Sequence, residues 1–389
     1  MDLPGPARAV CHAAVGADLF WYAADADALT LVREGGLRAP EHVQYAWAHP
    51  VLPVLYAAYS NRSTADDHHG VACYRIEPAT GRLTELHRPL DLPHRPIHLS
   101  VDPAGRFLLV ASNQPSALVV HALEADGAIG ERVEQPGPVD VGNYAHQVRT
   151  TPAGDAVVVC ARGSDATATE PGAPGALVVF RFRDGRLSHR RSITVGDGRD
   201  FGPRHVDFHP TKPFVYVSLE RGNQVLTHGV RDGGITPEPL HSAPTAARPD
   251  LRAPQQYLGP VHVHPSGRHL YLVNRSDGTV PSRGRAVHGE GENTVAVFAL
   301  DPDTGEPTLA QTVGIDAFHA RTFAIHPSGT MLVTAAVAPL AERVGDDVRE
   351  VAAGFSVFGI GDDGRLTFAR TYDVDVRCGP LFWCGMLRR

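Results

Sequence analysis

The sequence has few cysteines, and their spacing excludes two kinds of scaffold. Five cysteines are scattered over 389 residues, and no Cys-x-x-Cys pair occurs. A disulfide-stapled fold and a zinc ribbon both need regularly spaced cysteines. We therefore expect the thiols to be reduced and buried, as in a cytoplasmic protein.

Long apolar runs and clustered positive charge are missing as well. No segment approaches the ~18 apolar residues that a membrane helix needs, and the N-terminus lacks the basic stretch and apolar core of a secretory leader. Lysine is nearly absent and the formal net charge is -7, so no basic stripe offers a surface to nucleic acid. We expect a soluble, cytoplasmic protein with neither a membrane nor a nucleic-acid partner.

Several well-known catalytic motifs do not occur. The chain has no Gly-x-Ser-x-Gly, His-Glu-x-x-His or Walker A pattern. The signatures of serine hydrolases, zincins and P-loop nucleotide-binding proteins are therefore missing. His262 and His264 alternate along one predicted strand but have no carboxylate at useful spacing. The sequence predicts no metal and no cofactor.

The sequence is rich in turn residues that separate short apolar runs. Glycine and proline number 39 and 32, and 43% of the residues are hydrophobic, which favours an all-β fold with a large core. One proline recurs between two apolar strands, at Pro50, Pro103, Pro152, Pro210, Pro265 and Pro327. Four of these turns read Pro-x-Gly, in which glycine supplies the positive φ that tight hairpins need.

Each proline turn is followed by the same succession of strands. The second strand of each unit is an apolar run, at Val54–Ala58, Phe107–Ala111, Ala156–Cys160, Phe214–Ser218, His269–Val273 and Met331–Ala335. A third strand follows, at Gly70–Ile76, Ala117–Leu123, Ala176–Phe182, Gln224–Val230, Thr294–Leu300 and Gly354–Ile360. A glycine turn and a fourth strand close the unit. Four antiparallel strands about every 50 residues are typical of a β-propeller blade.

The two ends of the chain supply the parts of one more blade. Six full units run from about residue 39 to residue 377, residues 8–38 resemble strands two to four of a blade, and residues 379–388 resemble one apolar strand. A blade built from both ends would pair the edges that an open ring exposes. The sequence thus predicts an all-β, seven-bladed β-propeller that is a single domain over residues 1–389, its last blade closed by the N- and C-terminal segments.

Equivalent positions in the blades gather polar residues at one end of the predicted channel. Six residues before each proline, at the start of the innermost strand, stand Ile97, His146, Arg204, Gly259 and Arg321. Ten residues after it, at the end of the second strand, stand Asn113, Arg162, Glu220, Arg275 and Val337. Because the two strands are antiparallel neighbours, both sets lie at the same end of the hairpin. The irregular turn at residues 49–53 leaves the register of the first blade open.

This polar set predicts a binding site at one mouth of the channel. Arginines that converge with one acid and one histidine favour an anionic or carbonyl-bearing small molecule, and a water-lined structural rim is the alternative interpretation. His319 lies within reach of the same mouth, whereas His205 should face between blades because neighbouring strand residues point to opposite sides. Long irregular segments, among them Ser276–Asn293 and Ala338–Glu350, should surround the mouth.

The chain resembles the seven-bladed β-propeller lactonase family, which includes propeller-type 6-phosphogluconolactonase and 3-carboxy-cis,cis-muconate lactonizing enzyme. The resemblance covers nearly the whole chain and rests on residues 202–210 with Glu220 beyond them, on residues 264–275, and on the terminal strand from Gly379. It implies that His146, Arg204, Glu220 and Arg275 are the catalytic residues and matches a family arginine to Arg321. Leu219 stands where relatives often carry asparagine.

The resemblance and the register together support three hypotheses. The first is a lactone hydrolase acting on a sugar-type or carboxylated lactone. Water would attack, His146 or Glu220 would take its proton, and Arg204 and Arg275 would hold the anion and stabilise the oxyanion. The second is a lactonizing cycloisomerase, or another acid–base isomerase or lyase, that uses the same four residues on an unsaturated carboxylate. The third is a propeller that binds a ligand without catalysis.

Further residues of the mouth are expected to bind the substrate, a small anionic lactone or carboxylate. They are Arg321, Arg162, Asn113 and His319. The sequence does not distinguish His146 from Glu220 as the base, and it predicts no oligomeric state.

Overall fold

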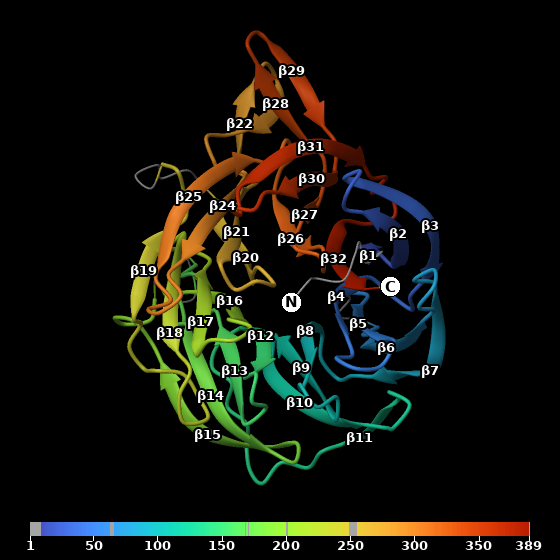
Figure 1. Ribbon diagram of the computed structural model, residues 1–389, viewed down its shortest axis with the longest axis vertical. Coiled ribbons are helices and arrows are strands. Elements are labelled where there is room, and N and C mark those ends of the chain that lie inside the picture. The colour runs from blue at the N-terminus through green and yellow to red at the C-terminus, as the bar shows by residue number, and fades with distance from the viewer. Residues whose placement is uncertain are drawn as a thin grey trace.

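The computed structural model describes residues 9–62, 66–167, 169, 171–199, 201–248 and 255–388. Within these ranges the chain forms seven four-stranded antiparallel sheets and two two-stranded sheets. The four-stranded sheets stand around a ring, as Figure 1 shows, with one strand of each sheet nearest the centre. The predicted seven-bladed propeller is confirmed. That all 389 residues form one domain stays a prediction.

Six blades follow one another along the chain, each beginning at the channel. Blade 1 is β4 (Val43–Ala48), β5 (Val54–Ser60), β6 (His69–Ile76) and β7 (Leu83–Asp91). Blade 2 is β8 (Pro96–Val101), β9 (Phe107–Asn113), β10 (Ser116–Leu123) and β11 (Ile129–Arg132). Blade 3 is β12 (Ala145–Thr150), β13 (Ala156–Ala161), β14 (Ala176–Arg183) and β15 (Arg186–Ile193).

The next three blades repeat this order. Blade 4 is β16 (Pro203–Phe208), β17 (Phe214–Leu219), β18 (Gln224–Gly229) and β19 (His241–Pro244). Blade 5 is β20 (Gln256–Val263), β21 (His269–Ser276), β24 (Thr294–Leu300) and β25 (Pro307–Gly314). Blade 6 is β26 (Ala320–Ile325), β27 (Met331–Ala336), β30 (Gly354–Ile360) and β31 (Leu366–Asp373).

Blade 7 is assembled from both ends of the described chain. Its outer strands are β1 (Ala9–Val15), β2 (Asp18–Asp25) and β3 (Thr30–Arg38), and its innermost strand is β32 (Leu381–Arg388). β32 pairs antiparallel with β1, so Ala9 lies opposite Arg388. This pairing gives both strands a partner where an open ring would leave free edges, and it confirms the predicted closure.

The core lies between the blades. Seven clusters of buried apolar side chains each join the facing sides of two neighbouring blades. The second strands are covered on both faces, and every residue of β13 is buried. A strand buried on both faces reads as a continuous apolar run rather than an alternating one. This is why the second strand of each unit was plain in the sequence.

Three of the proline turns are linked to the turn of the next blade by a histidine. His209 lies next to Pro210, and its Nε2 is 2.9 Å from the carbonyl oxygen of Gly267 in the following turn. Gly267 has a φ of +73° and its Cα faces the His209 ring so closely that a Cβ would lie 2.5 Å from Cε1. His264 makes the same contact with Gly329 of blade 6 at 2.8 Å. Contacts between neighbouring blades thus explain why these turns contain a histidine and a glycine.

A β-bulge near the start of every innermost strand aims side chains at the channel mouth. In β16 the pairing with β17 shifts between Pro203 and His205, so Arg204 is the extra residue. The same shift occurs in the other six inner strands, at Gln44, Ile97, His146, Gly259, Arg321 and Phe382. Bulges bend the strand and redirect the side chain. Gln44 stands six residues before Pro50, so the first blade follows the common register.

Two insertions that the sequence analysis described as irregular form hairpins. β22 (Thr279–Ser282) pairs with β23 (Arg285–His288), and β28 (Leu340–Val344) pairs with β29 (Asp347–Val351). In Figure 1 they project beyond blades 5 and 6. Ion pairs join the two hairpins, with Arg283 2.9 Å from Asp346 and Arg285 3.5 Å from Glu350. The strands of these hairpins are short and rich in charged residues, so the alternation of apolar and polar residues that marks a strand could not be recognised in the sequence.

The cysteines differ from the prediction at one position. Cys11, Cys73, Cys160 and Cys384 are buried free thiols, as expected, whereas Cys378 is exposed in the turn before β32. The prediction of buried thiols was therefore wrong for Cys378. The described chain contains no helix long and apolar enough to cross a membrane.

Candidate active site

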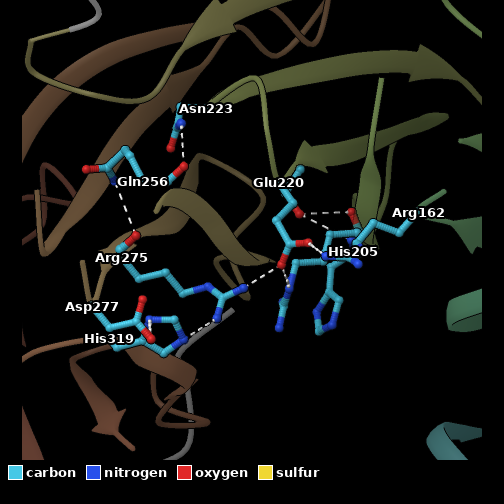
Figure 2. A network of polar contacts seen from close by, with 10 residues as sticks. Arg162, His205, Glu220, Asn223, Gln256, Arg275, Asp277 and His319 are labelled. Carbon is cyan, nitrogen blue, oxygen red and sulfur yellow. Dashed lines mark hydrogen bonds and ion pairs between the residues drawn. The ribbon is translucent and has the colours of Figure 1, made fainter. Parts of the chain in front are cut away.

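Glu220 is the centre of an ionic cluster at the channel mouth. It follows β17, and its backbone N–H donates to the carbonyl oxygen of Gly202 at 2.9 Å. Its Oε1 accepts hydrogen bonds from Arg204 Nε at 3.0 Å and Arg275 Nη2 at 2.5 Å, and its Oε2 accepts one from Arg162 Nη1 at 2.6 Å. Figure 2 shows Arg275 and Arg162 on either side of Glu220. Three blades therefore meet at one carboxylate, and the predicted grouping of these four residues is present in the structure.

The cluster holds its acid ionised. Burial by itself would raise the pKa of Glu220, but Arg275, Arg204 and Arg162 outweigh it and lower this pKa to about 2. Burial, together with repulsion from Arg275, lowers the pKa of Arg204 to about 9 despite attraction to Glu220. Arg204 is only 1% exposed. Glu220 is thus a carboxylate with almost no affinity for a proton at neutral pH, and its role in the cluster is that of a counter-ion.

His146 lies on the bulge of β12, beside this cluster. Its side chain is buried, and its ring centroid is 5.3 Å from that of His205. Burial, then Arg204, Arg321 and Arg162, lower the pKa of His146 well below its ordinary value. The imidazole is therefore neutral at pH 7 and can accept a proton. Its Nδ1 is buried with no hydrogen-bond partner in the part of the chain that the structure describes.

His205 does not face between blades, so that expectation was wrong. Its ring lies 5.9 Å from the ring of His98 and 6.2 Å from that of Tyr45, which belong to blades 2 and 1. Contacts to blade 1 from blade 4 have to cross the channel. The bulge at Arg204 breaks the alternation on which the prediction depended. Three buried histidines, His98, His146 and His205, therefore lie together beneath the mouth.

His319 reaches the cluster through Arg275, as its predicted place at the mouth required. Arg275 Nη1 donates to His319 Nε2 at 2.6 Å, and His319 Nδ1 lies 3.3 Å from Asp277 Oδ2. The backbone N–H of His319 donates to Asn293 Oδ1 at 2.7 Å. Asp277 and Asn293 both belong to the insertion that follows β21, and the sequence analysis named neither as a site residue.

Arg321 stands on the bulge of β26 and stacks on an aromatic ring. Its guanidinium lies 4.1 Å from the ring centroid of Phe382, and that of Arg62 lies 4.7 Å from the same centroid. Burial, then Arg204 and Arg275, lower the pKa of Arg321 well below its ordinary value. Among the described residues no carboxylate pairs with Arg321 or Arg62 within salt-bridge distance. Phe382 is therefore a platform for two unneutralised arginines.

A further arginine continues the ring toward blade 3. Arg95 donates from Nε and Nη2 to Gln44 Oε1, at 3.1 and 2.8 Å. The guanidinium of Arg162 lies 4.3 Å from the ring centroid of Tyr144. Arg62, Arg95, Gln44, Tyr144 and Phe382 were missed from the sequence. Gln44 and Phe382 occupy the bulge position. Gln44 could have been found by extending the register to blade 1, whereas no turn proline follows Phe382 from which to count.

Asn113 is buried at the end of β9, at the predicted height of the mouth. No hydrogen bond of its side chain to the ionic cluster is present within the described ranges, and its Oδ1 is buried without a partner. The structure thus brings His146, Arg162, Arg204, Glu220, Arg275, Arg321 and His319 together, and leaves Asn113 outside their contacts.

Several nitrogens of the cluster still have donors to offer. Arg204 Nη1, Arg275 Nε and Arg162 Nε are buried and make no hydrogen bond to the described protein atoms. Buried polar groups are ordinarily hydrogen-bonded, so unmatched guanidinium donors beside a neutral histidine suit an anionic or carbonyl ligand. The described residues contain no group of three or more His, Cys, Asp or Glu arranged to hold a metal ion.

Comparison with known proteins gives a match over most of the chain. The family model "Lactonase, 7-bladed beta-propeller" matches residues 15–338. The 6-phosphogluconolactonase of Bacillus subtilis is 27% identical over 277 residues, which are 69% of this chain and 71% of that protein.

Solved structures share the fold over nearly the whole chain. A protein from Lactobacillus plantarum has a TM-score of 0.70 and 21% identity and covers 98% of both chains. The periplasmic gluconolactonase of Pseudomonas aeruginosa has a TM-score of 0.69 and 20% identity, covering 96% of this chain and 97% of its own.

Proposed function

The chain belongs to the seven-bladed β-propeller lactonase family, and from this premise we propose that it hydrolyses a small anionic lactone of the sugar type. The observation that supports the proposal best is the pairing of a neutral histidine with buried arginines that keep unmatched donors, at the mouth of the channel. Lactone hydrolysis needs a base for water and donors for the oxyanion, and both are available here.

A phosphorylated or carboxylated sugar lactone suits the charge of the mouth. Arg62, Arg95 and Arg321 have no carboxylate partner among the described residues, and an anionic substituent would neutralise them. Curated relatives are named 6-phosphogluconolactonase. 6-Phosphogluconolactone is therefore the first compound to test, with the unphosphorylated lactone as its comparison.

We assign the base to His146 rather than Glu220. In the first step the oxygen of a water molecule bonds to the lactone carbonyl carbon while a ring nitrogen of His146 takes one of its protons. The bond from the carbonyl carbon to the ring oxygen then breaks, and that oxygen receives the proton from His146. The product acid ionises and releases one proton to solvent. Both carboxylate oxygens of Glu220 already accept hydrogen bonds from arginines, whereas Nδ1 of His146 has no partner in the described protein and can accept the proton of water.

Arg204 and Arg275 are assigned to the carbonyl oxygen. Their Nη1 and Nε atoms, respectively, are buried and unmatched in the described protein, and Glu220 fixes both guanidinium groups. Donors held in place before the reaction stabilise the oxyanion without a cost of reorganisation. Arg162, Arg321 and Asn113 are assigned to the rest of the substrate.

The family membership favours an enzyme over a non-catalytic binding module. A lactonizing cycloisomerase stays the second candidate, because the arginines of the mouth have charge enough for more than one carboxylate. Ring closure and ring opening also pass through the same bond to the ring oxygen. The cytoplasmic location stays a prediction.

A panel assay tests the proposed reaction. The purified protein is mixed with 6-phosphogluconolactone, gluconolactone or a carboxylated lactone, and a pH indicator records acid release above the spontaneous rate. The loss of ultraviolet absorbance of a muconate is followed in parallel. Acid release on a lactone alone supports the proposed hydrolase. Turnover of the muconate alone would contradict the hydrolase and support the cycloisomerase.

Replacement of Arg321 by leucine is expected to weaken substrate binding more than catalysis. A charge-assisted hydrogen bond contributes about 1.5–3 kcal/mol, so KM should rise roughly ten- to hundredfold while kcat stays within about threefold. Steady-state kinetics measure both. The control is Arg377→Leu, which removes an exposed arginine paired with Asp375. An unchanged KM would remove Arg321 from the substrate-binding set.

A further inference from the structure

Arg275 is held from two sides. Its Nη2 donates to Glu220 and its Nη1 donates to His319 Nε2, as Figure 2 shows. Its side chain is only 4% exposed. The position of this guanidinium therefore depends on a histidine from blade 6 as much as on the acid from blade 4.

His319 is itself fixed by its surroundings. Its backbone has a φ of +53°, a conformation that costs energy for a residue with a side chain. Asn293 stabilises it, because its Oδ1 accepts both from the backbone N–H of His319, at 2.7 Å, and from that of Ser276, at 3.0 Å. Both Asn293 and Ser276 bound the insertion that carries Asp277. A strained residue held by a second segment is a common feature of functional sites.

The contacts determine which nitrogen of His319 carries the proton. A guanidinium is a donor only, so Nε2 has to accept from Arg275 through its lone pair. The proton of the neutral ring is then on Nδ1, which lies 3.3 Å from Asp277 Oδ2, within ion-pair distance but outside hydrogen-bond geometry. The negative charge of Asp277 therefore favours the same tautomer that the donor from Arg275 requires.

We infer that Asp277 and His319 are positioning residues that hold Arg275 in its place for the reaction, and that His319 does so only as a neutral imidazole. The inference rests on the proposed function for the role of Arg275. It changes the assignment of His319 from a substrate contact to a residue that acts through Arg275.

Protonation of His319 would disrupt the arrangement. An Nε2–H would face the Arg275 Nη1–H, so two donors and two positive charges would meet. The charged groups facing His319 are Arg275 on β21, Asp277 in the insertion and Arg321 on β26. His288 of β23 lies beyond Asn293 and contacts it at 3.2 Å. Burial lowers the pKa of His319 first, Asp277 raises it in part, and Arg275 and Arg321 lower it further.

These charges set the direction of the pH effect. The pKa of His319 is lower than its ordinary value, and that of His146 lies well below its own. As pH falls below about 6.5, His319 should therefore be protonated before His146. The first loss of kcat/KM on the acid side is expected from His319, and a second loss at lower pH from His146.

Three variants separate positioning from a structural role in a pH profile of kcat/KM. His319→Gln keeps an acceptor oxygen that cannot be protonated, so its kcat/KM should stay within about fivefold of the wild-type value. Its pH profile should lack the first fall of kcat/KM on the acid side. His319→Ala should lower kcat/KM roughly ten- to hundredfold at pH 8, because a misplaced group costs this much. Asp277→Ala removes a carboxylate that favours the imidazolium, so the fall of kcat/KM on the acid side should move to lower pH.

A matched pair elsewhere supplies the control. His87 and Asp126 form an exposed histidine–aspartate contact at 3.0 Å away from the mouth, and His87→Gln should leave the pH profile unchanged. If His319→Gln and His319→Ala are equally inactive at every pH, or if the acid loss persists unchanged in His319→Gln, the inference is wrong.

A second measurement does not depend on turnover. In long-range ¹H–¹⁵N NMR spectra of the unliganded protein, neutral His319 should have its proton on Nδ1, and the signal is assigned by its absence in His319→Gln. A proton on Nε2 would overturn the inference even if the protein is an active lactonase. The expected tautomer in a protein that hydrolyses no lactone would overturn the proposed function and leave the Asp277–His319–Arg275 arrangement supported.

Discussion

Replacement of His146 by alanine is expected to lower kcat/KM for the lactone by about 10³-fold, since general-base assistance contributes about 10²–10⁴-fold. The effect should fall on kcat, because the arginines that bind the anion remain in place. We expect this loss because only a neutral imidazole can accept the proton of water. Burial and three neighbouring arginines keep the ring neutral, since they lower the pKa of His146 well below its ordinary value. Steady-state kinetics on the substrate found in the lactone panel measure the change.

The control for His146 is a histidine that is equally buried but distant from the mouth. His121 in β10 is buried and its Nδ1 contacts the carbonyl oxygen of Gly130 at 3.1 Å. His121→Asn should keep its kcat within about threefold. Turnover that survives in His146→Ala with unchanged kcat would transfer the base to another group and refute the proposed mechanism.

Replacement of Glu220 by glutamine is expected to destabilise the fold as well as the site. The variant leaves Arg204, which is 1% exposed, without its charged partner. Breaking a buried ion pair from one side costs about 3–5 kcal/mol. For a chain of this length that corresponds to a fall in Tm of about 5 °C, which differential scanning fluorimetry detects.

The destabilisation should depend on pH with a defined sign. The pKa of Glu220 is about 2 in the folded protein, below the value of about 4.3 for an unfolded chain. A group with a depressed folded pKa stabilises the protein above its unfolded pKa, and this contribution disappears as pH falls toward the folded pKa. The difference in unfolding free energy between wild type and Glu220→Gln, about 3 kcal/mol at pH 6, should therefore shrink between about pH 4.3 and pH 2.

An exposed pair provides the comparison. Glu342 contacts Arg349 on the β28–β29 hairpin, where the arginine side chain is 69% exposed. Glu342→Gln should change the unfolding free energy by less than about 1 kcal/mol, as surface ion pairs do. Equal urea midpoints for Glu220→Gln and Glu342→Gln at pH 6 would show that the cluster at the mouth is hydrated and that its charges are screened.

Local patterns were sufficient to predict the architecture. The proline turns and the apolar second strands repeat in six units, and the remaining fragments at the two ends complete blade 7. A strand buried on both faces has to be apolar throughout, and a hairpin turn has to contain residues that adopt its dihedral angles. Both requirements act within a few residues of the chain, so they are visible without a structure.

The same register located most of the candidate site. Arg204 and Glu220 were expected at one mouth because they occupy equivalent ends of antiparallel strands, and the structure joins them at 3.0 Å. The count failed for His205, since a bulge changes which side a residue faces. Arg62 and Arg95 lie outside the repeated strands, and no pattern in the sequence placed them at the mouth.

The sequence by itself determined the number of blades, the closure by the two ends and the convergence of His146, Arg204, Glu220 and Arg275. Only the tertiary structure decided what those residues do to one another. Three arginines turn Glu220 into a permanent carboxylate and leave His146 as the neutral group. Asp277 comes into the site through a histidine from the next blade. Protonation states and tautomers depend on burial and on charges from other blades, and these distances across the channel are set only when the ring has closed.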